Sequence, residues 1–155
     1  MDNLKRVQDY VDQFGLGLKV VSHEGDTSTA EKAAETLGLE VGQIAKSLLF
    51  RLKDGRYIMI LSAGDVKIND KKFKKIFKTK PKLAKPKEVE EVTGYPIGGV
   101  CPFALQNPVE IYLDSSLNRF DVVYAAAGTP FSSLPITMEQ LKIVTKGEEV
   151  DVSES

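Results

Sequence analysis

The stretch IAKSLLFRLKDGRYIMILSA, residues 44–63, holds two strand-sized apolar segments on either side of the turn sequence Lys-Asp-Gly. Asp54-Gly55 is a favoured pair for a tight turn between antiparallel strands, because glycine adopts positive φ without a steric penalty. The stretch therefore predicts a β-hairpin with strands at residues 44–52 and 56–63.

Helical and strand-like segments are interspersed along the rest of the chain. Apolar residues at helical spacing, with proline and glycine at the boundaries, predict helices at residues 4–14, 28–38, 69–77, 86–94 and 137–144. Further strands are predicted at residues 18–23, 108–114, 120–128 and 132–136. In the second helix, Ser28 is expected to cap the first turn and Glu31 to complete a capping box. The predicted class is α+β, with flanking helices around a mixed, partly barrel-like β-sheet.

Composition is typical of a globular domain with its own core. The chain has 155 residues, 42% of them hydrophobic and 28% charged, with no repeat or linker, so residues 1–155 are expected to form one domain. The start of the chain is no signal peptide, no stretch is long enough to cross a bilayer, and one cysteine excludes an internal disulfide. We therefore expect a cytoplasmic protein without a membrane partner.

Positive charge is concentrated in one segment of an otherwise acidic chain. Residues 67–87 contain ten lysines and one acidic residue, whereas the formal net charge of the whole chain is -1. A segment of this kind fits either a phosphate-rich partner or a solvated helix surface, and its composition leaves both open.

Cys101 and His23 are the chain's single cysteine and single histidine. A nucleophilic thiol needs a base and an orienting group, so Cys101 is more plausible as a packing residue. His23, at the end of a predicted strand, fits a general base or a hydrogen-bonded strand-end residue, and the second interpretation is favoured. One histidine and one cysteine without a ligand-spaced pair predict no metal site, and nothing in the sequence calls for a cofactor.

Lys46 and the stretch GYPIGGVCPFAL, residues 94–105, are candidates for ligand binding. A lysine at the head of a buried strand either extends to solvent or holds an anion in a pocket. The glycine-rich stretch lacks the spacing of a Walker A loop or a dinucleotide fingerprint. Its bare amides suit a backbone cradle that polarises a carbonyl, and equally a plain turn between strands.

The order of these pieces resembles one known family. His23, then STAEKAAETLGLEVGQIAKSLLF (residues 28–50), TGYPIGGVCPFAL (residues 93–105) and AAAGTPFSSLPIT (residues 125–137) together resemble the YbaK/EbsC family. That family comprises freestanding relatives of the editing domain inserted in bacterial prolyl-tRNA synthetases. The resemblance runs from about Leu18 to Val144, and it favours the cradle over the turn for residues 94–105.

The resemblance implies a trans-editing hydrolase that cleaves the ester of mischarged tRNA, chiefly cysteine or alanine on proline tRNA, without a metal. The family lysine falls on Lys46, and the Gly-x-x-x-Pro loop falls on Gly98 to Pro102. The implied catalytic residues are Lys46, Gly98 and Gly99. The implied substrate-binding residues are His23, Thr29, Ser47, Val100, Cys101, Pro102, Ala126, Ala127, Gly128 and Ser133.

Several positions depart from the family pattern. Relatives usually carry serine at Cys101 and glycine at Ala104, and some carry aspartate at Ser133. The last loop, residues 126–130, is also altered. Because these residues are expected to line the amino-acid pocket, the departures leave the edited amino acid open.

The expected partners are the acceptor end of mischarged tRNA and prolyl-tRNA synthetase. The residues expected to contact tRNA are Lys71, Lys72, Lys74, Lys75 and Lys78, since Lys and Arg neutralise phosphates. Two other functions fit the sequence: a non-catalytic module that binds aminoacyl or RNA ligands beside a synthetase, and a cysteine-dependent hydrolase built on Cys101.

Overall fold

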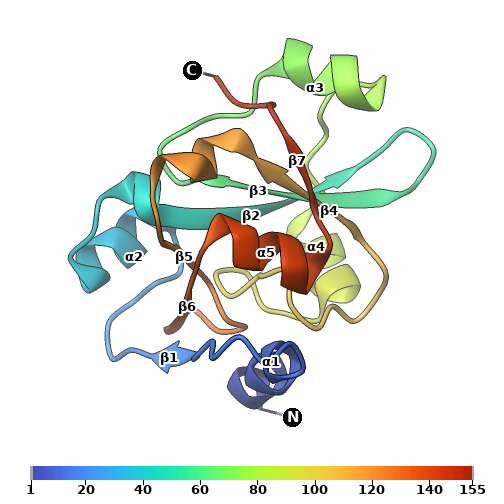
Figure 1. The fold of residues 1–155 in the computed structure, drawn as a ribbon. Coiled ribbons are helices and arrows are strands. Elements are labelled where there is room, and N and C mark those ends of the chain that lie inside the picture. Colours follow the sequence, from blue (N-terminus) through green and yellow to red (C-terminus); the bar gives the residue numbers. More distant parts are fainter. Residues whose placement is uncertain (1, 155) are drawn as a thin grey trace.

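The structure, a computed structural model, describes residues 2–154 and is organised around the predicted hairpin (Figure 1). Strands β2 (Ile44–Arg51) and β3 (Tyr57–Ala63) pair in an antiparallel register that runs from Ala45 opposite Ala63 to Arg51 opposite Tyr57. Asp54 and Gly55 occupy the turn, with Gly55 at a φ of 91°. The hairpin prediction is therefore confirmed.

Five further strands extend this hairpin into a seven-stranded sheet of order β1-β6-β5-β2-β3-β4-β7. Their bounds are β1 (Val21–Ser22), β4 (Glu110–Asp114), β5 (Val123–Ala125), β6 (Ser132–Ile136) and β7 (Glu148–Val150). Strand β4 is parallel to β3 and to β7, and β5 is parallel to β2 but antiparallel to β6. The sheet is therefore mixed, which confirms the predicted α+β class.

The five predicted helices are all present, and the figure shows them arranged around the sheet. They are α1 (Asn3–Asp12), α2 (Ala30–Leu37), α3 (Asp70–Phe77), α4 (Pro86–Thr93) and α5 (Met138–Thr145). Glycines in the left-handed conformation follow two of them: Gly38 ends α2 at a φ of 70°, and Gly94 ends α4 at a φ of 82°. Two short 3-10 segments, η1 (Val41–Gln43) and η2 (Ser115–Arg119), were not predicted.

Two local predictions were wrong, and one strand was not predicted. Thr29, not Ser28, caps α2: its side chain accepts a hydrogen bond from the Lys32 amide. Strand β1 covers two residues rather than residues 18–23, because its single partner β6 pairs with it at just two positions. Strand β7 lies in the acidic tail, where the sequence pattern showed no strand, and β4 alone holds it in the sheet.

The hairpin separates two apolar layers because alternate side chains of a strand point to opposite faces. Ala45, Leu49, Met59 and Leu61 belong to the main core, which α1, α5 and the 94–105 stretch cover. On the other face, Phe50, Ile58 and Ile60 pack with Phe73 of α3. Phe73 is fully buried while most of the α3 lysines are exposed, so one helix combines core packing with a basic surface. No helix among residues 2–154 is long and apolar enough to span a bilayer.

Candidate functional site

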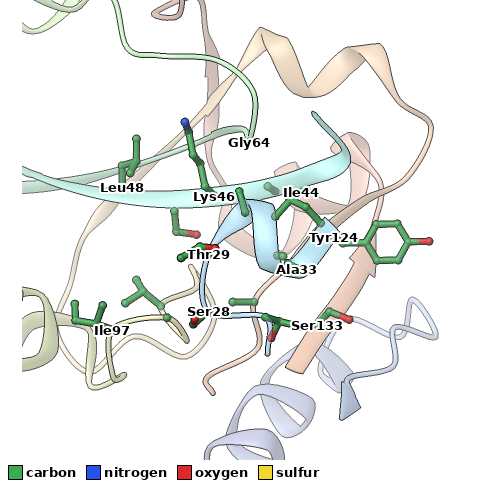
Figure 2. Close-up of a pocket in the computed structure, with 18 of the residues that line it drawn as sticks. Ser28, Thr29, Ala33, Ile44, Lys46, Leu48, Gly64, Ile97, Tyr124 and Ser133 are labelled. Atoms are coloured by element: carbon green, nitrogen blue, oxygen red, sulfur yellow. The ribbon is translucent and has the colours of Figure 1, made fainter. Parts of the chain in front are cut away.

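A cleft of about 350 Å³ lies along the edge of β2. This volume is within the range of small-ligand pockets. Figure 2 shows it between β2 and the start of α2. Its walls come from residues 27–31, 33, 37, 44–49, 64, 83–84, 89, 97–98, 100, 124–126 and 132–133. Segments distant in the sequence thus meet at one edge of the sheet.

The cleft brings together about half of the predicted site residues. Those that line it are Thr29, Lys46, Ser47, Gly98, Val100, Ala126 and Ser133. Those that do not line it are His23, Gly99, Cys101, Pro102, Ala127 and Gly128. Most of the second group lie behind the wall, so we treat them as positioning or packing residues.

Lys46 extends from the face of β2 opposite the main core. Figure 2 shows Lys46 and Leu48 on one side of the strand, with Ser28, Ile97 and Ser133 on the other. The ammonium donates a hydrogen bond to the Val66 carbonyl oxygen. Partial burial lowers the pKa of Lys46, and the nearby carboxylates of Glu31 and Asp65 oppose that decrease. The side chain is therefore a half-buried cation beside the cleft. It could bind an anion if its hydrogen bond to the Val66 carbonyl oxygen were broken or shared.

The 94–105 stretch contributes its backbone to the cleft. Gly98 has a φ of 91°, and a Cβ there would lie 2.8 Å from the Ser28 Cβ. A side chain at Gly98 would therefore be strained and would also collide with Ser28, in the segment that precedes α2. Gly98 and Val100 line the cleft, and neither amide has a recorded hydrogen-bond partner among residues 2–154. These two N–H groups are therefore candidates for hydrogen bonds to a ligand.

Gly99 has a different role from the one expected. Its amide donates to the Pro96 carbonyl oxygen at 2.9 Å, and its own carbonyl oxygen accepts from the Gly128 amide at 3.0 Å. A Cβ at Gly99 would lie 2.6 Å from the Thr129 nitrogen. Gly99 therefore permits close contact between the 94–105 stretch and the loop at residues 126–130, and its amide is not free for substrate.

Helix α1 supports this loop from behind, a role that sequence reasoning missed. Arg6 donates to the carbonyl oxygens of Thr93 and Ala104, with an Nε to Ala104 distance of 3.0 Å, and its guanidinium lies 4.5 Å from the centre of the Tyr95 ring. Asn3 Nδ2 donates to the Gly128 carbonyl oxygen at 2.9 Å. Helical spacing in the first residues revealed the helix but gave no signal for these polar contacts.

His23 and Ser133 form a pair at the end of the cleft. His23 Nε2 lies 2.7 Å from Ser133 Oγ, and the His23 amide donates to the Phe131 carbonyl oxygen. This matches the interpretation of His23 as a hydrogen-bonded strand-end residue, with Ser133 between it and the cleft. Among residues 2–154 no group of three or more His, Cys, Asp or Glu side chains is placed to hold a metal ion.

Basic side chains line a second hollow beside the cleft, here named the basic groove. It has a volume of about 810 Å³ and is lined by Arg51, Leu52, Lys53, Lys74, Lys78, Thr79, Lys80, Pro81 and Lys82. A smaller hollow lies between them, lined by Arg51, Lys82, Leu83, Lys85, Lys87, Glu88 and Glu91. It shares Arg51 and Lys82 with the basic groove and Leu83 with the cleft, so the two hollows lie on either side of it.

The five lysines predicted to contact tRNA do not share one environment. Lys74 and Lys78 line the basic groove, while Lys71 and Lys75 are exposed on α3 outside it. Lys72 instead donates to Asp151 at 3.0 Å and to the Ser153 carbonyl oxygen at 2.8 Å. These contacts tie the C-terminal segment to α3, so Lys72 is less available for a phosphate than the others.

Comparison with known proteins defines the class of this protein. The model of the aminoacyl-tRNA editing domain matches residues 24–143. YwhH, an uncharacterized protein of Bacillus subtilis (strain 168), is 42% identical over 139 residues, which cover 90% of this chain and 88% of that protein. The chain belongs to the family of aminoacyl-tRNA editing domains, which confirms the resemblance noted from the sequence.

Two further relatives show where such domains occur. The crystal structure of a candidate trans-editing enzyme for prolyl tRNA synthetase is 36% identical, with a TM-score of 0.90 over 100% of this chain and 99% of that chain. The proline–tRNA ligase of Bacillus licheniformis is 28% identical over 137 residues, which cover 81% of this chain. The match accounts for 24% of the ligase, so the chain corresponds to about a quarter of that larger protein.

The environment of Cys101 predicts an unreactive thiol. Its side chain is fully buried, and burial raises the pKa of the thiol to about 12. Because the thiolate is the reactive form, iodoacetamide at pH 8 should leave the folded protein unlabelled and should label the protein unfolded in urea. Mass spectrometry measures the labelled fraction. Rapid stoichiometric labelling of the folded protein would contradict this assignment and revive Cys101 as a nucleophile.

Proposed function

We propose that this protein is a trans-editing deacylase that hydrolyses the ester between a small amino acid, alanine or cysteine, and proline tRNA. The observation that carries the proposal is the proximity of two sites. One is a cleft with a half-buried cation and unpartnered backbone amides, and the other is a groove lined with lysines, with one small hollow between them that shares residues with both. Membership in the aminoacyl-tRNA editing family supports the same chemistry.

The proposed reaction needs positioning more than an activated side chain, because an aminoacyl ester is already reactive. The amides of Gly98 and Val100 donate to the ester carbonyl oxygen and stabilise the negative charge that develops on it. A water molecule, held in place by a hydroxyl of the terminal adenosine, attacks the carbonyl carbon and releases a proton. The bond to the ribose oxygen then breaks, and that oxygen takes up a proton, which gives the free amino acid and the tRNA.

Lys46 is proposed to hold the phosphate of the terminal adenosine. A phosphate competes well with the neutral Val66 carbonyl for the ammonium, since hydrogen bonds between ions are stronger than those to neutral groups. Fixing the phosphate would fix the position of the ester, and positioning of this kind supplies a large share of many rate enhancements.

The walls of the cleft support a small amino acid. Ala45, Ala125 and Ala126 line it where larger side chains would occupy volume. Ala127, which the sequence also placed in the wall, is fully buried behind it, and its amide donates to Ser132 Oγ at 3.2 Å. The size limit therefore rests on Ala126 and its neighbours rather than on Ala126 and Ala127 together.

The basic groove is proposed to bind the acceptor stem of the tRNA. Its position next to the cleft suits a nucleic-acid strand whose 3′ end enters the cleft. In this proposal residues 1–155 act as one editing domain in the cytoplasm, alongside prolyl-tRNA synthetase and without a cofactor.

A deacylation screen tests the function directly. Alanyl-, cysteinyl- and prolyl-esters of proline tRNA are compared at equal concentration, with the spontaneous hydrolysis of each measured without protein. An apolar pocket discriminates one methylene by about 1–3 kcal/mol, so the alanyl or cysteinyl ester should react at least about tenfold faster than the prolyl ester. Fastest hydrolysis of the prolyl ester would contradict an editing role. Binding of all three without hydrolysis would identify a non-catalytic module.

Lys46→Ala should remove most of the deacylation while the protein stays folded. The expected fall in kcat/KM is about a hundredfold, the size of a positioning effect in an active site. Lys46→Arg, which keeps the charge, should retain more activity than Lys46→Ala, and circular dichroism with urea unfolding checks the fold. Wild-type turnover by a folded Lys46→Ala protein would exclude the proposed role.

Replacing Lys74, Lys78, Lys80 and Lys82 by Gln should raise the Kd for tRNA and reduce its salt dependence. Each lost phosphate contact should lower the slope of log Kd against log salt by about 0.7–0.9. The matched control replaces four exposed or partner-bound lysines elsewhere, Lys5, Lys19, Lys142 and Lys146, with the same change in net charge. Equal effects of the two sets would show that net charge alone matters and that the groove is a solvated surface.

A further inference from the structure

Strand β2 has one residue whose outer backbone edge is left unpaired, Ser47. The Leu49 carbonyl oxygen accepts from the Ala84 amide, so Leu49 directs its N–H and C=O away from β3. In an antiparallel pair this direction alternates with every residue, so Ser47 directs its N–H and C=O the same way. Neither group has a recorded partner among residues 2–154.

The neighbours of β2 end on either side of Ser47. Strand β5 pairs with β2 through Ile44 opposite Tyr124 and Ala45 opposite Ala125, and three residues after Ala125 the Gly128 amide donates to Gly99 instead. On the other side, the segment before α4 pairs with β2 through Leu83 opposite Phe50. Continuing that register would bring Pro86 opposite Ser47, but proline has no N–H and Pro86 begins α4. The sheet therefore has a gap one residue wide.

The cleft occupies this gap. Its lining includes Ala125 and Ala126 from one side, Leu83 and Ala84 from the other, and Ser47 between them. The Ser47 hydroxyl is also buried without a hydrogen-bond partner. Buried polar groups are nearly always hydrogen-bonded. The buried Ser47 hydroxyl, together with an unpaired backbone N–H and C=O on the same residue, therefore indicates a site for a ligand that supplies the missing partners.

We propose that the aminoacyl group of the substrate binds opposite Ser47 as a one-residue β-strand that fills the gap. This inference rests on the deacylase function proposed above. The α-ammonium donates to the Ser47 carbonyl oxygen, and the Ser47 N–H donates to the ester carbonyl oxygen, as two residues do in a hydrogen-bonded antiparallel pair. The oxyanion that forms on this oxygen during the reaction has three lone pairs, so two remain available to the loop amides of Gly98 and Val100.

This arrangement determines what the cleft recognises. Paired residues of an antiparallel ladder project their side chains to the same face, so an L-amino acid would direct its side chain to the face of β2 that carries Ala45 and Leu49. A D-amino acid would direct it to the opposite face, where Lys46 lies. Esters that lack the ammonium would lose one of the two hydrogen bonds.

The first test compares substrates that differ only in the α-ammonium. Alanyl and propionyl esters of the same tRNA are assayed, and each rate is divided by its hydroxide-catalysed rate without protein. The propionyl ester lacks one hydrogen bond to a charged group. Its corrected kcat/KM should therefore be lower than that of the alanyl ester by a factor of at least about ten. Equal corrected values would overturn the proposal while leaving the deacylase function intact.

The second test removes one N–H from the protein. A semisynthetic chain with lactic acid at position 47 is compared with Ser47→Ala, from which it differs only by an ester oxygen in place of the amide. Since this N–H makes no ladder hydrogen bond, both proteins should unfold at similar urea concentrations. The ester-containing chain should have a kcat/KM about tenfold lower. Equal activity would overturn the role of the Ser47 amide.

A binding measurement separates this inference from the proposed function. The stable amide analogue 3′-alanylamido-3′-deoxyadenosine should shift the amide proton of Ser47 downfield in NMR spectra and bind more tightly than its propionyl counterpart. This readout does not depend on turnover. If the protein hydrolyses no ester but binds the alanyl analogue through Ser47, the deacylase function fails and the strand-edge site stands. Binding with no change at Ser47 overturns the site.

Discussion

The pairing of β2 with β3 is the interaction on which the rest of the structure depends. Its register fixes which side chains enter the main core and which face α3, because a shift by one residue would exchange the two faces. It also directs the Ser47 backbone outward and the Lys46 side chain to the face opposite the core. Both the candidate cation and the candidate strand-edge site are thus consequences of one ladder of backbone hydrogen bonds.

A second constraint is the close approach of backbones around the cleft. Gly98 lies against Ser28 and Gly99 against Thr129, at distances that leave no room for a Cβ. Helix α1 holds the same loops from the outside through Asn3 and Arg6. The cleft is therefore rigid on the side of the 94–105 stretch, which suits a site that works by positioning a reactive ester.

The packing of α3 against the sheet also determines where its positive charges lie. Phe73 anchors α3 against Phe50, with ring centres 5.1 Å apart, and this orients most of the helix lysines outward. The acidic C-terminal segment binds one of them, Lys72, and leaves Lys74 and Lys78 to the basic groove. The lysines of residues 67–87 look alike in the sequence, but the fold gives them two roles. Lys72 binds the C-terminal segment, whereas Lys74 and Lys78 face the solvent in the basic groove.

The sequence by itself determined the hairpin, the five helices and the mixed α+β class, because hydrophobic period, turn residues and helix boundaries are local properties. It also indicated Lys46, Ser47 and Gly98 as candidates, because their neighbours in the chain carry the family pattern, and the structure places all three along the cleft. The tertiary structure alone decided that Gly99 and Cys101 lie behind the cleft wall and that Arg6 supports the loop. It alone decided that β7 joins the sheet. These features depend on contacts between segments far apart in the chain. The gap at Ser47 is of the same kind: it exists because β5 and the segment before α4 stop on either side of it, and no local pattern in β2 records where its neighbours end.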